Sequence, residues 1–280
     1  MNGGLPSRGL FNASNIPRKL QEKIGQQIEP YSIIPLLDAE VSGSGTLVKI
    51  DGVSGILTAG HVVRSWEKSQ PKYQRPKRLG IVPGRQAATL VEEPLEHFHA
   101  FVIEAGESEE FGPDLAFVRI PSGSGFLNTL ASKKSFFELS GPAVRNRTIY
   151  VTRSTPVAAI GIVAQKTERT GGKTVLNQYV ILGTEPQTTE RNGFDYIDLH
   201  SRRSLEPNTP NSFGGVSGGG LWRFSIARLS ESEIKPYDFQ LAGLAFYQYP
   251  ETADGVATVR FHGPRSIYER LLPQVRNWLG

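Results

Sequence analysis

The sequence contains no cysteine among its 280 residues. This absence excludes disulfide bonds, thiolate metal sites and a cysteine nucleophile together. Long apolar runs are also missing: no stretch of about 18 apolar residues occurs, and the first residues, MNGGLPSR, hold no apolar run of secretory length. We therefore expect a cytoplasmic protein that does not cross a membrane.

Neither sign of charge dominates the sequence. Lys and Arg number 31 against 27 Asp and Glu, which leaves a formal net charge of +4. This mild excess is compatible with a nucleic acid or an acidic partner and requires neither. One basic loop stands out, and we interpret it as solvated surface, with nucleic-acid binding as a secondary alternative: Lys68, Lys72, Arg75, Lys77 and Arg78.

The 30 glycines and 19 prolines are spread along the chain, between short apolar runs. This pattern predicts an all-β protein of many short strands. Residues 45–50 and 53–59 flank Asp51-Gly52, a hairpin turn pair, and His61 follows where a short helical turn can begin. The other strands are expected at 86–91, 97–104, 115–120, 148–153, 157–165, 175–183, 196–200, 220–227, 241–247 and 256–261.

Both ends of the chain show helical spacing. Near the start, apolar residues recur every four positions from Ile16 to Ile28 before Pro30, which predicts a short amphipathic helix packed on the body rather than on a partner. Near the end, Ile267 to Trp278 predicts a helix kinked or restarted at Pro273. The expected organisation is an N-terminal extension (1–30), a first half (31–135) and a second half (136–280).

One serine, Ser217, lies in a cluster of glycines. The stretch Asn211-Ser-Phe-Gly-Gly-Val-Ser217-Gly-Gly-Gly-Leu-Trp222 holds five glycines and leads into an apolar strand. A serine hydroxyl becomes a nucleophile only when a base takes its proton and donors stabilise the oxyanion. Because a turn between strands has the same composition, Ser217 is a candidate nucleophile only if the chain also supplies a base and an acid.

His61 and Asp114 meet this requirement. Each adjoins a glycine or proline turn and an apolar strand, as Ser217 does. A serine, a histidine and an aspartate are the set that acyl transfer uses: nucleophile, general base and orienting acid. His97 and His99 could share a strand face, and Asp195, Asp198 and His200 form another polar cluster, but we interpret both groups as strand and turn residues without a metal.

At these residues the chain resembles the chymotrypsin/trypsin-like serine peptidases, in a cysteine-free form similar to bacterial members. Thr58-Ala-Gly-His61-Val, Asp114-Leu-Ala-Phe-Val and Gly215-Val-Ser217-Gly-Gly resemble the three motifs of that family, from about residue 40 onward. The resemblance implies two six-stranded antiparallel β-barrels, with His61 and Asp114 on the first and Ser217 on the second, plus a C-terminal helix. It also implies a serine endopeptidase that uses an acyl-enzyme and no cofactor.

The resemblance further assigns an oxyanion hole to the N–H groups of Gly215 and Ser217. The residue before the nucleophile is Val216, where many members have an aspartate that pairs with a new N-terminus after cleavage. We therefore expect no activation of that kind. The two glycines before Val216 predict a loop that substrate or a regulatory protein partner orders.

Motif alignment also places a substrate pocket. Asn211 and Ser212 would form its floor, and a strand with Phe246 and Gln248 its wall, with Gly255 facing Gln248. The floor residues carry no carboxylate that could bind the charged end of a Lys or Arg side chain, so we expect no preference for these residues at the cleavage site. Gln248 should narrow the pocket and favour a small or polar residue. Phe246 replaces a serine that in many members binds the aspartate, a role that Thr58 or a backbone group could take.

Two alternatives remain at the level of sequence. Gly215-Val-Ser217-Gly-Gly219 also fits the nucleophile turn of an α/β-hydrolase, with Asp238 or Asp254 and His262 completing a triad. That fold needs parallel strands alternating with helices, a pattern the chain lacks. The second alternative keeps the fold but not the activity: a catalytically silent pseudoprotease that binds peptides or other proteins.

Overall fold

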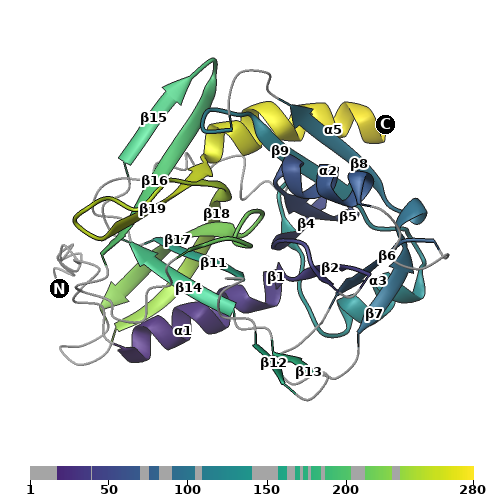
Figure 1. Ribbon diagram of the computed structural model, residues 1–280, viewed down its shortest axis with the longest axis horizontal. Helices are drawn as coiled ribbons and strands as arrows, with labels where there is room; N and C mark the ends of the chain where they lie inside the picture. The colour runs from purple at the N-terminus through teal and green to yellow at the C-terminus, as the bar shows by residue number, and fades with distance from the viewer. Residues whose placement is uncertain are drawn as a thin grey trace, which may run out of the picture.

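The computed structural model describes residues 18–38, 40–69, 76–81, 90–104, 109–140, 157–162, 168–170, 173–175, 178–183, 187–202, 212–228 and 234–280. The protein is mostly β-sheet, the strand pairing is almost wholly antiparallel, and the helices are few and short (Figure 1). Three expected features lie wholly or mostly outside the described residues: the strand at 148–153, residues 86–89 of the strand at 86–91, and the pocket residue Asn211.

The first half forms two sheets. A six-stranded sheet has the order β1-β4-β5-β9-β8, with β10 added to β4 in parallel, and a four-stranded sheet has the order β3-β2-β6-β7. The strands of the six-stranded sheet are β1 (Ser32–Ile33), β4 (Gly45–Ile50), β5 (Val53–Thr58), β8 (His99–Glu104), β9 (Asp114–Arg119) and β10 (Phe137–Glu138). Those of the four-stranded sheet are β2 (Pro35–Leu37), β3 (Glu40–Val41), β6 (Arg78–Ile81) and β7 (Val91–Pro94).

The second half is built on one seven-stranded sheet with the order β14-β11-β17-β18-β19-β16-β15. Its strands are β11 (Val157–Ile162), β14 (Gln178–Gly183), β15 (Gln187–Arg191), β16 (Phe194–Arg202), β17 (Gly220–Arg228), β18 (Ile234–Gln248) and β19 (Val256–His262). A separate hairpin pairs β12 (Glu168–Thr170) with β13 (Lys173–Val175). The strand pairings of this sheet are all antiparallel, which excludes the parallel sheet of an α/β-hydrolase.

The expected closure of each half into a six-stranded barrel is not confirmed. Within the described residues the three larger sheets have open orders, with β8, β7, β14 and β15 at edges. β15, at one edge of the seven-stranded sheet, is exposed along its whole length. The sequence did not predict this strand, because its residues are polar.

The hairpin of β4 and β5 forms where the sequence predicts it. Asp51 and Gly52 have φ values of +48° and +84°, the left-handed pair that a two-residue hairpin turn requires. β5 ends at Thr58, and α2 (Gly60–Lys68) begins two residues later, so His61 lies in the first turn of a helix. The other short helices are α3 (Gly125–Ala131), which the sequence analysis missed, η2 (Glu29–Tyr31) and η3 (Leu95–His97).

The two terminal helices cross over between the halves. α1 (Arg18–Ile28) precedes the first half in sequence but contacts β18 and β11 of the second, with Leu20, Ile24 and Ile28 at most 3% exposed. The C-terminal segment, η5 (Ser266–Leu271) followed by α5 (Leu272–Leu279), returns to the first half, where Trp278 packs on Phe101 and Phe117 (Figure 1). The first helix thus packs on the body, as expected.

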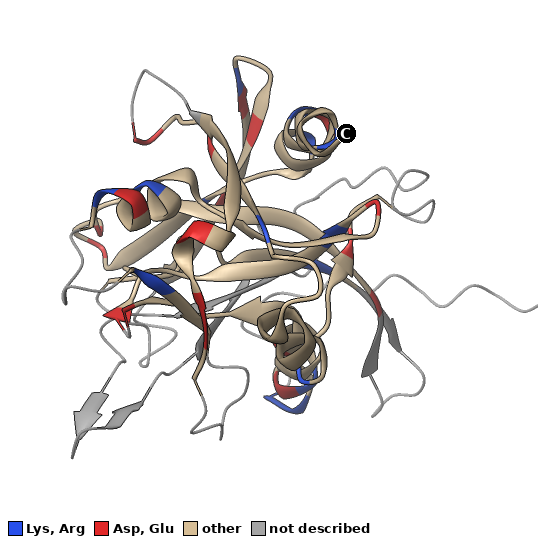
Figure 2. Ribbon diagram, turned by 90° about the vertical axis from the view of Figure 1, so that its right-hand side faces the viewer, with Lys and Arg blue, Asp and Glu red and all other residues tan. Residues whose placement is uncertain are grey.

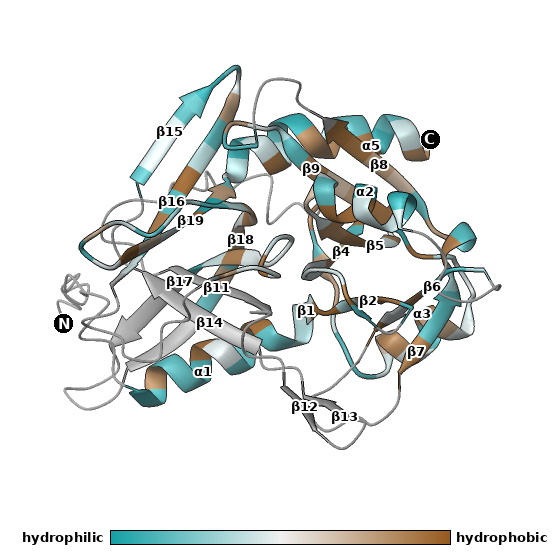
Figure 3. Ribbon diagram, viewed as in Figure 1, coloured by the Kyte–Doolittle hydropathy of each residue, from teal (hydrophilic) through white to brown (hydrophobic). Residues whose placement is uncertain are grey.

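These helices close the apolar core. Pro273 lies in the first turn of α5, so the helix restarts there as predicted. In Figure 3, hydrophobic and hydrophilic residues alternate along α1 and α5 as on amphipathic helices. One buried cluster joins both halves, because it contains the α1 side chains, Val48 and Leu57 of the first half, and Trp222 and Leu244 of the second.

Charged residues are interspersed in sign over the described elements (Figure 2). Two residues of the basic segment are held by the fold: Lys77 Nζ donates to the carbonyl oxygens of Trp66 and Glu67, and Arg78 pairs with Glu92. Residues 70–75 lie outside the described part. In the part that the structure describes, no helix is both long and apolar enough to span a membrane.

Candidate active site

His61 is presented at the start of α2. The apolar side chains of the helix, Val62, Val63 and Trp66, are at most 3% exposed and face the core, whereas the His61 side chain is 44% exposed. The change from strand to helix between Thr58 and Gly60 therefore turns the imidazole outward at the end of a buried strand. A ring in this position is anchored on one side and accessible on the other.

Asp114 holds this imidazole. Its Oδ2 lies 2.5 Å from His61 Nδ1, and its Oδ1 accepts the His61 main-chain N–H at 2.7 Å. Arg64, one turn further along α2, donates to the same Oδ1 at 3.3 Å. In a neutral ring the carboxylate keeps the proton on Nδ1, so Nε2 remains a proton acceptor on the outer side.

The charge state of Asp114 follows from these contacts. Burial alone would raise the pKa of this carboxyl, since the residue is 8% exposed. The hydrogen bonds from His61 and the charges of His61 and Arg64 outweigh burial, and the pKa of Asp114 lies below its usual range. Asp114 is therefore an ionised acceptor at neutral pH, whose contacts to His61 hold both the ring and the helix backbone.

The loop with Ser217 has a defined turn before the serine. Val216 N–H donates to Phe213 O at 3.0 Å, and Gly215 has a φ of +93°, the conformation that the third residue of a type II turn needs. Gly218 and Gly219 also donate their N–H groups, to Ala245 O and Val216 O. Within the described residues, the N–H groups of Gly215 and Ser217 have no acceptor.

The first half binds this loop directly. Ser44 donates its N–H to Ser217 O at 2.9 Å and its hydroxyl to Gly215 O at 2.7 Å, and Thr46 Oγ1 donates to Gly218 O at 3.3 Å. A Cβ at Gly43 would lie 3.0 Å from Val62 Cγ2 and 3.3 Å from Ser217 O. Gly43 is therefore in close contact with both Ser217 and Val62, the residue that follows His61.

The structure therefore brings the three predicted residues to one place, the junction of the two halves. The Ser217 hydroxyl makes no hydrogen bond with His61 among the described contacts. The expectation that substrate or a partner orders this loop stays a prediction. In the structure, the N–H and the hydroxyl of Ser44 donate to main-chain oxygens of the loop and hold it. Val216 also holds it: the side chain is 2% exposed and packs with Phe213, Leu221 and Ala245.

Gln248 closes one end of the expected substrate pocket. Its Oε1 accepts the Phe213 N–H at 2.8 Å and the Ser212 hydroxyl at 3.3 Å, so the side chain spans from β18 to the loop before Ser217. The prediction for Gly255 is wrong: the residue across from Gln248 in the β18–β19 ladder is Val259, and Gly255 lies in the turn before β19.

Phe246 does not face the pocket. A register shift between Ala245 and Tyr247 interrupts the strand at this residue, and the Phe246 ring, 4% exposed, stacks on His262 at 4.1 Å between centroids. The compensation expected for the missing serine comes from the His61 main chain and not from Thr58, whose hydroxyl donates to Ser44 O.

His262 is a residue of this site that the sequence analysis missed. Its Nε2 accepts the main-chain N–H of Asp114 at 3.0 Å, and its ring is wholly buried. Burial lowers the pKa of His262 to about 3, against a raising effect of Asp114, so the ring is neutral. The only signal in the sequence is a histidine that ends an apolar strand, and nothing local links it to a residue 148 positions away.

The turn before Asp114 is also held from the second half. Arg260 donates to Glu110 O at 3.2 Å, Tyr196 OH to Phe111 O at 3.0 Å, and Tyr249 OH to Glu110 Oε1 at 2.8 Å. Arg260 is fixed in turn by two hydrogen bonds of 2.8 Å to Asp198. We call residues 110–112 with these contacts the aspartate turn.

The other polar groups have structural roles. Asp195 caps η5 by accepting the main-chain N–H of Ser266, and His200 Nδ1 lies 2.8 Å from Thr258 Oγ1. His97 lies in η3 and contacts Glu93, so it does not share a strand face with His99, which begins β8. No group of three potential metal ligands is found among the described residues.

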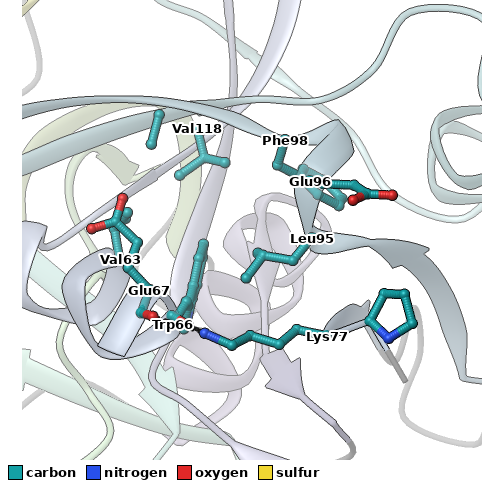
Figure 4. A pocket seen from close by; sticks show the side chains of 10 residues that line it. Val63, Trp66, Glu67, Lys77, Leu95, Glu96, Phe98 and Val118 are labelled. Carbon is teal, nitrogen blue, oxygen red and sulfur yellow. Dashed lines mark hydrogen bonds between the residues drawn. The ribbon is translucent and has the colours of Figure 1, made fainter. Parts of the chain in front are cut away.

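A cavity of about 390 Å³ lies behind α2, on the side away from His61. Figure 4 shows Trp66, Leu95, Phe98 and Val118 around it, with Lys77 crossing its edge. Trp66 also donates from Nε1 to Ser42 Oγ at 2.9 Å. This cavity is separate from the residues predicted to bind substrate.

Comparison with known proteins gives little beyond this geometry. No protein-family profile and no curated protein match the sequence. Among solved structures, the chain is similar to one from a study of how aromatic interactions drive the coupled folding and binding of the intrinsically disordered Sesbania mosaic virus VPg protein. The two are 14% identical, the match covers 86% of this chain and 90% of that one, and the TM-score is 0.45. At a TM-score below 0.5 this likeness assigns neither a family nor a function.

Proposed function

We propose that the chain is a serine endopeptidase that cleaves protein or peptide substrates with Ser217 as nucleophile, His61 as general base and Asp114 as orienting acid. The observation that carries the proposal is the arrangement at the junction of the halves. Asp114 binds both the ring and the main chain of His61, while Ser44 docks the Ser217 loop beside the same helix. A chymotrypsin-like pair of barrels is the fold we propose for this arrangement.

The chemistry proceeds in two steps. Ser217 Oγ attacks the substrate carbonyl carbon as its proton passes to His61 Nε2, and the imidazolium then gives that proton to the leaving amine when the C–N bond breaks. Water repeats the sequence on the acyl-enzyme and restores the serine. Asp114 remains ionised throughout and stabilises the imidazolium. The absence of a hydrogen bond between Ser217 and His61 among the described contacts is compatible with this role, because such contacts tighten when substrate binds.

The free N–H groups of Gly215 and Ser217 support an oxyanion hole. Both lack an acceptor among the described residues, while the N–H groups of their neighbours Gly214, Val216, Gly218 and Gly219 each donate a hydrogen bond. Removing one donor of such a pair typically costs about 100-fold or more in turnover. The buried Val216 side chain supports a site that forms without a cleaved N-terminus.

The test is covalent labelling by a fluorophosphonate, which requires an activated serine. The wild-type chain should be labelled at Ser217, Ser217→Ala should not be labelled, and His61→Ala should lose at least about three orders of magnitude in labelling rate. Ser132→Ala, on the exposed end of α3, is the matched control and should label as wild type. A correctly folded wild-type chain that takes up no probe would refute the peptidase and favour the pseudoprotease.

Several expectations remain predictions. These are the absence of any cofactor, a cytoplasmic location, a regulatory protein partner, and no binding to nucleic acid or membrane. The neutral Gln248 across the expected pocket supports a small or polar residue at the cleavage site rather than Lys or Arg.

A further inference from the structure

We propose that His262 positions Asp114 from the opposite half of the molecule, and that its ring nitrogen Nε2, rather than its aromatic bulk, carries this role. The inference rests on the proposed function of Asp114. It concerns a residue that lies outside the three motifs and touches neither the substrate nor the reacting atoms.

The contact acts on the main chain of Asp114. His262 Nε2 accepts the Asp114 N–H at 3.0 Å, at the residue where β9 begins. This fixes the Cα of Asp114 and therefore the point from which its carboxylate reaches His61. In the same region Tyr196 and Arg260 hold the aspartate turn, so both the residue and the segment before it are set by strands β16 and β19.

The ring has no freedom to turn. It is wholly buried, stacked on Phe246 with an interplanar angle of 21°, and contacted by Phe194 and Tyr196. Since Nε2 must accept, the neutral ring carries its proton on Nδ1, which has no partner among the described residues. An unpaired buried donor typically costs about 1–3 kcal/mol, so packing alone does not account for a histidine here.

Protonation would remove the contact, because Nε2–H would then meet Asp114 N–H, donor against donor. The charged and titratable groups that act on the ring are Asp114 on β9 and Arg260 on β19, and Tyr196 on β16 packs against it. Burial lowers the pKa of His262, so the ring is uncharged at neutral pH and Nε2 can accept the Asp114 N–H.

Two substitutions separate the nitrogen from the ring. His262→Phe keeps an aromatic ring against Phe246 and removes the acceptor. His262→Gln removes the ring and keeps an acceptor, because the amide Oε1 can take the place of Nε2. The labelling rate at Ser217 should fall about 10- to 100-fold in His262→Phe, the usual effect of losing an outer hydrogen bond to a functional residue, and less than about fivefold in His262→Gln.

A second readout does not depend on Ser217. The proton shared by His61 Nδ1 and Asp114 Oδ2 should give a far-downfield NMR resonance, because the contact is short. This resonance should be retained in His262→Gln and in Ser217→Ala, and shifted upfield or lost in His262→Phe. A wild-type chain that shows the resonance but takes up no probe refutes the peptidase and leaves the positioning role standing.

The reverse order of the two variants, or equal effects, would overturn the proposal and assign His262 to packing. Labelling is compared below the unfolding midpoint of each variant. If neither His262 variant folds, the side-chain nitrogen-15 resonances of His262 in the wild-type chain provide the decision, because they show which ring nitrogen carries the proton. A proton on Nδ1 supports the proposal, and a proton on Nε2, which could not then accept from Asp114 N–H, would overturn it.

Discussion

A single added methyl group, in Gly218→Ala, should displace the Ser217 loop from the first half while the rest of the molecule still folds. The φ of Gly218 is +91°, and a Cβ added there would overlap both Ser44 O and Thr58 Oγ1, well inside the closest approach of real Cβ atoms. Gly218→Ala therefore carries two costs. The first is the left-handed backbone, about 1–2 kcal/mol for a residue with a side chain. The second is displacement of the loop from the first half.

The second cost follows from the contacts that must change. Moving the loop lengthens the hydrogen bonds from Ser44 Oγ to Gly215 O and from Ser44 N–H to Ser217 O, of 2.7 and 2.9 Å. Each such bond contributes about 1 kcal/mol net. The free energy of unfolding should therefore fall by about 3–4 kcal/mol in all. The labelling rate should fall about 100-fold in the folded molecules, since a misplacement near 1 Å has that effect.

Gly123→Ala is the matched control. Gly123 has a φ of +72°, and a Cβ there would meet nothing within 4 Å. The control therefore carries only the backbone cost of about 1–2 kcal/mol and should label at the wild-type rate. Urea unfolding and labelling of the two variants side by side measure both quantities. If the two variants lose the same stability and label equally, the loop is not docked through Gly218 and the argument from its contacts is wrong.

Two further predictions concern the pocket and pH. Gln248→Ala should open the expected pocket and shift the cleavage profile of a peptide library toward larger side chains, because no side chain then reaches the Phe213 N–H. The control is Gln274→Ala, on the exposed face of α5. A profile that Gln248→Ala leaves unchanged would count against the pocket. His262 has a pKa of about 3 when folded and about 6.5 when unfolded, so its stabilising contribution is complete above pH 6.5 and declines as pH falls toward 3. Between pH 7 and pH 5, the free energy of unfolding measured in urea should fall by about 2 kcal/mol more for wild type than for His262→Gln. Equal falls in the two proteins would contradict a buried neutral ring.

The sequence predicted best what depends on neighbouring residues. The Asp51-Gly52 turn, the start of α2 at His61 and the restart of the last helix at Pro273 are all set by the backbone preferences of a few adjacent residues. His61, Asp114 and Ser217 were grouped because each stands beside a turn at the edge of a strand and because acyl transfer needs these three residue types. The motif resemblance then supported the grouping.

What the sequence did not predict depends on contacts between distant segments. Motif alignment placed Phe246 in the pocket wall, but the irregular pairing of β18 with β19 at this residue lets its ring stack on His262. His262 was considered only for a rival fold, because its partner is 148 residues away. Motif alignment also set Gly255 opposite Gln248, whereas the pairing of the two strands sets Val259 there.

The crossing of the terminal helices has a consequence for synthesis. α1 precedes β18 and β11 in the chain by more than a hundred residues, yet its buried face packs on both strands. The first sheet, in turn, waits for Trp278 to cover Phe101 and Phe117. During synthesis neither half can therefore complete its core before the covering residues have been made. A growing chain exposes the apolar face of the first sheet until the last helix is available.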